Sequence, residues 1–117
     1  MGLDMYAGVK RSGEDAIEGF EYWRKHPSLH GWMHKLHIEK GGDEDPDTFN
    51  MVAVELTERD LLRLRGDIMM SNLPETNGFF FGSVISDPEQ RRIDLKFTRT
   101  ALDFVRSGHQ VFYRSWW

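Results

Sequence analysis

Residues 22–37 read YWRKHPSLHGWMHKLH and hold two of the four tryptophans and four of the five histidines. On a helix that turns by about 100° per residue, the apolar side chains of this stretch share an arc of roughly 100°, the width of a core-facing stripe. They are Tyr22, Leu29, Trp32, Met33 and Leu36. The histidines fall in the adjoining arc, so we expect them to border the core. We therefore predict a helix that begins near residue 14 or later, runs to about residue 38 and is stopped by Gly41 and Gly42. Pro27 leaves open an alternative with two helices, one ending near His26 and one that has Pro27 at its first position.

Three segments outside this stretch alternate between apolar and polar residues as β-strands do. They are residues 2–9, 50–56 and 109–117. The three phenylalanines at residues 79–81 lie between glycines and predict a short buried strand or a wall beside a cavity. Because both chain ends are predicted strands, we expect the first and last strands to lie side by side.

Two more helices are indicated by their start and stop signals. Thr57 fits an N-cap, with Asp60 three residues later, before the apolar residues Leu61, Leu62, Leu64 and Ile68. A third helix is predicted from Pro88 to the stop at Gly108. An alternative places Arg91 and Arg92 in a loop and starts this helix near Thr98.

The predicted fold is a single α+β domain over residues 1–117, with about four mostly antiparallel strands packed against about three helices. The chain has no cysteine, which excludes disulfides and thiolate chemistry. No apolar run approaches the roughly 20 residues of a membrane span, and no signal peptide is indicated, so we expect a cytoplasmic protein. The net charge of −4 argues against a duplex nucleic acid as partner.

Several motifs resemble a family of small proteins of bacteriophages and prophages. They are MGLDMY at residues 1–6, YWRK at residues 22–25, LH with Trp32 at residues 29–32, and LPETNGFFFG at residues 73–82. The resemblance implies a phage context, the cytoplasm of a bacterial host and no catalytic activity. Family members share His30 and Trp32, whereas His26, His34 and His37 depart from the pattern.

A metal site is one hypothesis for the histidines. His26, His30 and His34 have i, i+4 spacing, and neutral imidazole suits zinc or nickel. One helix cannot surround an ion, so a residue such as Asp4 would have to complete the site. Histidines at a core boundary are more often structural, and we expect no metal and no cofactor.

An enzyme is a second and less favoured hypothesis. His30 would act as general acid or base, oriented by Asp4 or Asp103, with Arg24 or Arg114 holding an anionic substrate. The sequence contains no nucleophile elbow, phosphate-binding loop or metalloprotease motif.

The favoured hypothesis is a binding protein, because the chain has more aromatic side chains than a small core easily encloses. The predicted partner-binding residues are Trp23, Arg24, Lys25, His30, Trp32, Phe80, Tyr113, Arg114 and Trp116. We expect a phage-type accessory protein that binds a host protein stoichiometrically, in host takeover or counter-defence. An alternative ligand is a nucleotide or another flat anion, held between aromatic rings and cations. The aromatic chain end could instead be buried in a homodimer.

Overall fold

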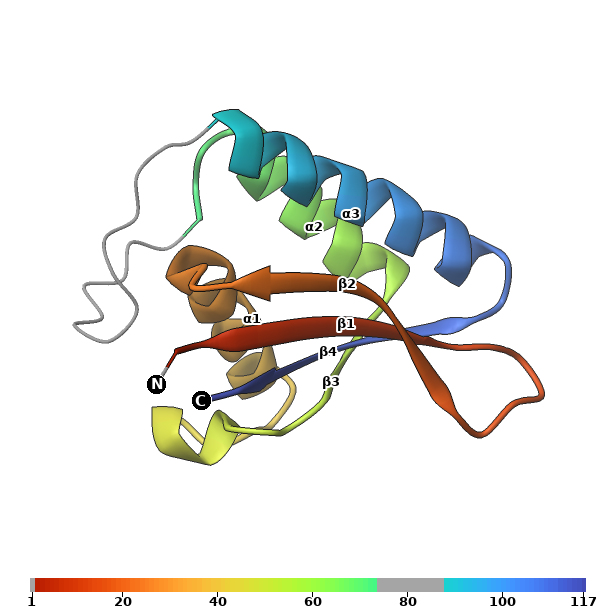
Figure 1. Cartoon of the computed structure of the whole chain (residues 1–117), viewed down its shortest axis with the longest axis horizontal. Coiled ribbons are helices and arrows are strands. Elements are labelled where there is room, and N and C mark those ends of the chain that lie inside the picture. The colour runs from red at the N-terminus through yellow and green to blue at the C-terminus, as the bar shows by residue number, and fades with distance from the viewer. Residues whose placement is uncertain (1, 74–87) are drawn as a thin grey trace.

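The computed structural model describes residues 2–73 and 88–117 and shows an α+β fold built on one antiparallel sheet (Figure 1). The strand order is β2-β1-β4-β3. The described elements are β1 (Asp4–Lys10), β2 (Ile17–Arg24), α1 (Pro27–Glu39), the 3₁₀ helix η1 (Pro46–Phe49), β3 (Val54–Leu56), α2 (Glu58–Met69), α3 (Pro88–Arg106) and β4 (Gln110–Trp116). The predicted fold class and the pairing of the first and last strands are confirmed.

One face of the sheet forms the floor of the hydrophobic core. Met5, Ala7 and Val9 of β1 and Val111 and Tyr113 of β4 are buried there, at alternate positions of their strands. Apolar side chains of α1, α2 and α3 belong to the same buried cluster, so the three helices cover this face. The opposite face carries the other half of each strand's side chains.

The helix predicted over residues 14–38 begins only at Pro27, as the alternative start had it, and ends at Glu39. Its N-cap is His26, and Gly41 follows it with a φ of 98° that favours glycine. The buried stripe of α1 contains Leu29, Trp32, Met33 and Leu36 as predicted.

The part of that prediction before Pro27 is wrong, because residues 17–24 form β2, which pairs with β1. The register shifts between Ala7 and Gly8, which pair with Glu21 and Gly19, so Phe20 is an extra residue in β2. The ring of Phe20 packs against Phe97 and Phe104 of α3, at centroid distances of 5.8 and 5.1 Å. Tyr22, predicted for the core, lies on the surface.

The other two helices start and stop close to the predicted residues. Thr57 caps α2, and its side chain and that of Asp60 form a reciprocal capping box. Residues 91 and 92 lie inside α3, so the alternative start near Thr98 is wrong. Gly108, with a φ of 90°, follows α3.

Two further strands were predicted, over residues 50–56 and 79–81. The strand predicted over residues 50–56 is shorter and runs from Val54 to Leu56. The strand predicted at residues 79–81 lies outside the described residues. Within the described ranges, no helix has both the length and the apolarity needed to cross a membrane.

Candidate functional site

The face of the sheet turned away from the helices presents aromatic and basic side chains in register. Across β2, β1 and β4, one row of the sheet aligns Arg24, Asp4 and Trp116, and the next row aligns Tyr22, Tyr6 and Arg114. Directly opposite residues on one face of an antiparallel pair have neighbouring side chains. We call these six residues the aromatic face: Asp4, Tyr6, Tyr22, Arg24, Arg114 and Trp116.

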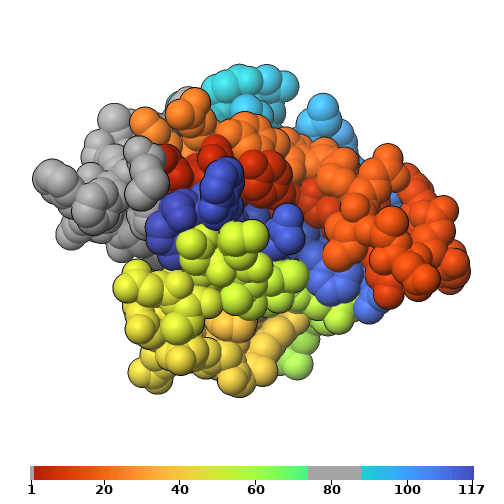
Figure 2. Space-filling view, turned by 60° about the horizontal axis from the view of Figure 1, so that its bottom comes forward, coloured from red at the N-terminus to blue at the C-terminus, as the bar shows by residue number. Residues whose placement is uncertain are grey.

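The rings of the aromatic face are open to solvent. Tyr6, Tyr22 and Trp116 are 39%, 50% and 57% exposed. Figure 2 shows this side of the molecule, where β1 in red, β2 in orange and β4 in blue reach the surface. Large rings at such exposure, gathered on one side of a sheet, are typical of an interaction surface.

Internal contacts order the centre of the face. The rings of Tyr6 and Tyr22 lie 5.2 Å apart and are tilted by 46°. The hydroxyl of Tyr22 donates a hydrogen bond of 2.6 Å to Oδ1 of Asp4, which raises the pKa of Tyr22 above its usual value. The two tyrosines are therefore held in place by contacts within the sheet.

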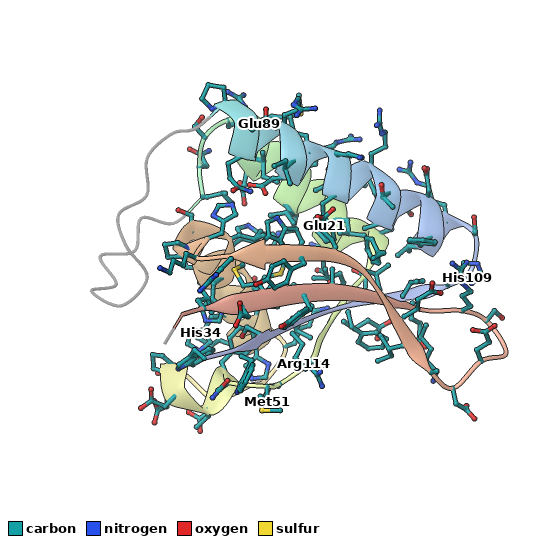
Figure 3. All side chains as sticks on the ribbon, viewed as in Figure 1. Glu21, His34, Met51, Glu89, His109 and Arg114 are labelled. Atoms are coloured by element: carbon teal, nitrogen blue, oxygen red, sulfur yellow. The ribbon has the colours of Figure 1, made fainter. Side chains whose placement is uncertain are left out.

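Two neighbours extend the face. Met51 is 56% exposed, and its backbone N–H donates to the carbonyl of Ser115, next to Arg114 in β4. Figure 3 shows Met51 and Arg114 at the same border of the sheet. At the end of β2, the side chains of Arg24 and Lys25 both lie near Gly2. The surface thus combines rings, a flexible thioether and several cations.

The structure divides the predicted binding residues between surface and core. Four are exposed, namely Arg24, Lys25, Arg114 and Trp116. Four others are buried and lie away from the exposed surface: Trp23, His30, Trp32 and Tyr113. Phe80 lies outside the described residues. Strand alternation and helix periodicity turn the four buried side chains toward the interface between the sheet and the helices.

A buried carboxylate fixes the junction between β2, α1 and α3. Asp94 is 2% exposed and accepts hydrogen bonds from Trp23 Nε1 at 3.1 Å and Gln90 Nε2 at 3.0 Å. Its second oxygen lies 2.7 Å from Nε2 of His26. The Trp23 ring also packs edge-on against Phe97 at 4.7 Å. Both oxygens of the buried carboxylate thus have partners, which is the condition for burying the group at little cost.

The other histidines of α1 surround a buried phenylalanine. Phe49 of η1 is fully buried, and the rings of His30, His34 and His37 lie 5.2, 5.1 and 4.9 Å from it. Nδ1 of His30 is 2.8 Å from the hydroxyl of Tyr113. Burial, and to a smaller degree the proximity of His34, lowers the pKa of His30 to about 4. His30 is therefore a neutral ring in the core at physiological pH.

The histidines suggested for a metal site have separate partners. His26 contacts Asp94, His30 contacts Tyr113, and Nε2 of His34 lies 3.4 Å from the carbonyl of Asp43. In residues 2–73 and 88–117, no group of three or more His, Asp or Glu side chains is arranged to hold a metal ion.

The acid–base set suggested for an enzyme is not assembled either. His30 lies on the helix-covered side of the sheet, whereas Asp4 lies on the aromatic face, hydrogen-bonded to Tyr22. Asp103 is an exposed residue of α3. Arg24 and Arg114 are likewise separated from His30 by the sheet.

Three members of the aromatic face, Asp4, Tyr6 and Tyr22, are not among the binding residues predicted from the sequence. The alternation of residues 2–9 already placed Tyr6 opposite the apolar side chains, but the ring was not weighed as a binding residue. Tyr22 was assigned to a helix, and the extra residue Phe20 interrupts the alternation that would have revealed a strand.

The sequence has no significant match among protein-family models, curated proteins or solved structures.

Proposed function

We propose that this chain is a binding protein that holds a partner protein stoichiometrically on the aromatic face. The observation that carries the proposal is the row-by-row alignment of three exposed rings with two arginines on one side of the sheet. Tyrosine, tryptophan and arginine are the residues that contribute most often to binding hot spots.

The charges of the face favour a protein partner over a polyanion. Asp4 lies between Arg24 and Trp116 and presents a carboxylate in the middle of the surface. The whole chain carries a net charge of −4. The phosphates of a nucleic acid would be repelled by the central carboxylate and by the net negative charge of the chain. A protein surface, in contrast, can match charges of both signs.

The phage resemblance of the sequence gives the proposal its biological context. We propose a host protein as the partner, with host takeover or counter-defence as the setting. A stoichiometric binder needs no catalytic group, in keeping with the buried side chains of His26 and His30, which contact Asp94 and Tyr113.

The proposal is tested by affinity capture from a bacterial lysate with matched surface variants. Trp116→Ala and Arg114→Glu remove a ring and reverse a charge on the aromatic face. Met70→Ala is the control, because Met70 is 71% exposed and apolar but follows α2, away from this face. We expect one bacterial protein to be retained in near-equimolar amount by the wild type and by Met70→Ala, and to be lost with the two face variants.

Two results would contradict the proposal. One is a capture pattern that the face variants leave unchanged. The other is a self-association, seen by light scattering after size-exclusion chromatography, that Trp116→Ala abolishes. That second result would make a further copy of this chain the occupant of the face.

A further inference from the structure

A second surface, unrelated to the aromatic face, lies between α2 and α3, which run side by side on the other layer of the molecule (Figure 1). A cavity of about 490 Å³ opens between them. Its described lining consists of four basic side chains and two apolar ones: Arg65, Arg92, Lys96, Arg99, Ile93 and Leu95. Small-molecule sites have volumes of roughly 300–1,000 Å³, so this cavity is of ligand size.

The basic residues reach the cavity because of their spacing. Arg92, Lys96 and Arg99 follow one another at intervals of four and three residues and so project from one side of α3. Arg65 comes from α2, next to the buried stripe that contains Leu64 and Ile68. The two helices therefore place cations on both walls.

Most of this positive charge is not neutralised by the residues that the structure describes. Arg92 forms an ion pair with Glu89. The side chains of Arg65, Lys96 and Arg99 have no hydrogen bond or ion pair with any residue in the described ranges, and no acidic side chain is part of the described lining. Like charges held together in this way repel one another, and a bound anion would remove that cost.

We infer that this cavity is a binding site for a small anion that carries two or more phosphate groups, of the nucleoside polyphosphate class. A single carboxylate would leave most of the cations unpaired, whereas each terminal phosphate brings up to about two negative charges and three acceptor oxygens. Guanidinium groups match phosphate oxygens with paired hydrogen bonds. Ile93 and Leu95 give an apolar wall for the organic part of the ligand.

The inference is tested by isothermal titration calorimetry with ATP, sodium tripolyphosphate and adenosine. We expect saturable binding of one ATP or tripolyphosphate per chain and no binding of adenosine. Arg65→Ala, Arg99→Ala and Lys96→Gln should each weaken the binding about tenfold or more, because each removes a charge-assisted hydrogen bond. All three side chains are exposed, so thermal unfolding should show that the variants remain folded.

Arg59→Ala is the matched control. Arg59 is an exposed arginine of α2 outside the cavity lining, so its removal changes the net charge equally and should alter the binding at most about twofold. Three results would overturn the inference: no saturable binding of either polyphosphate, an equal loss in Arg59→Ala, or adenosine binding as tightly as ATP. Binding of single-stranded RNA in place of the polyphosphates is one form of the first result. Trp116→Ala should leave this binding unchanged, so the two surfaces are tested independently.

Discussion

Asp94 is a single side chain that joins three elements of the fold. Its carboxylate accepts hydrogen bonds from Trp23 of β2 and Gln90 of α3, and one of its oxygens lies 2.7 Å from Nε2 of His26, the N-cap of α1. Because the group is buried, replacing it leaves donors without partners in a medium where water cannot replace the lost bonds. The whole junction therefore depends on one carboxylate.

We predict that Asp94→Ala lowers the free energy of unfolding by roughly 3–5 kcal/mol. Urea unfolding monitored by circular dichroism measures this change. Asp103→Ala is the control, because Asp103 is an exposed residue of the same helix and its loss should cost less than about 0.5 kcal/mol. Equal stability of the two variants would show that the buried network contributes nothing.

His30 predicts a pH dependence of stability. Its pKa is lowered to about 4 in the folded protein, below the usual 6.5. As pH falls, the unfolded chain takes up the proton first, so this residue's contribution to stability is lost between the two values. From pH 7 to pH 5 the loss amounts to about 2 kcal/mol.

The measurement is the free energy of unfolding at both pH values in the wild type and in His30→Gln. We expect the difference between pH 7 and pH 5 to shrink in the variant by about 2 kcal/mol, since glutamine does not titrate. Other groups titrate equally in both proteins and cancel in the comparison. The same pH dependence in both proteins would mean that His30 is protonated as easily in the fold as outside it.

At the start of α2, the capping residues predicted from the sequence form the cap that the structure shows. Thr57 accepts a hydrogen bond from the N–H of Asp60, and Asp60 accepts from the N–H of Thr57. Burial raises the pKa of Asp60, but hydrogen bonds from Lys40, at 2.6 Å, and from Thr57 outweigh burial and hold the pKa below its usual value. The cap thus also links the end of α1 to α2.

We predict that Thr57→Ala costs about 1 kcal/mol of stability, the usual effect of losing an N-cap hydroxyl. Thr57→Ser keeps the hydroxyl and should cost only a few tenths of a kcal/mol. Thermal unfolding of the three proteins measures both changes. A Thr57→Ser variant as unstable as Thr57→Ala would attribute the loss to the methyl group and not to the cap.

β2 shows why part of the fold could not be predicted from the sequence. Capping and stop residues are local signals, and they predicted α2, α3 and the end of α1. A strand is instead stabilised by its neighbouring strand. The sequence pattern of residues 17–24 alone therefore does not predict their pairing with β1. The bulge at Phe20 breaks the two-residue period, and the apolar residues that remain fit a helical arc by coincidence.

The sequence predicted which kinds of residue form the candidate site, namely aromatic rings and cations, but it predicted only some of the individual residues. Arg24, Arg114 and Trp116 are exposed as expected, because β4 alternates regularly and the end of β2 is polar. Trp23 and Tyr22 exchange roles, since a helix and a strand send adjacent residues to different sides. Cross-strand neighbours such as Tyr6 and Tyr22 could be brought together only by the register, which the sequence does not specify.

At the scale of the whole molecule, the large aromatic side chains of the described strands lie on both faces of one sheet. Trp23, Tyr113 and Phe97 fill the space between the sheet and the helices, whereas Tyr22 and Trp116 remain outside. A core of this size could not take in both sets without a second layer on the other face. The exposed set is thus available to a partner that would supply that layer.

This division predicts opposite effects for two tryptophans of the same sheet. Trp23→Ala should lower the free energy of unfolding by roughly 3–5 kcal/mol, because it opens a cavity and releases a hydrogen bond of Asp94. Trp116→Ala should change it by less than about 1 kcal/mol, because the ring is 57% exposed. Urea unfolding of both variants measures their stability, and affinity capture from a bacterial lysate with Trp116→Ala separately measures the proposed binding. If Trp116→Ala unfolded as readily as Trp23→Ala, its ring would be a structural group, and the aromatic face would lose the residue on which the proposed binding most depends.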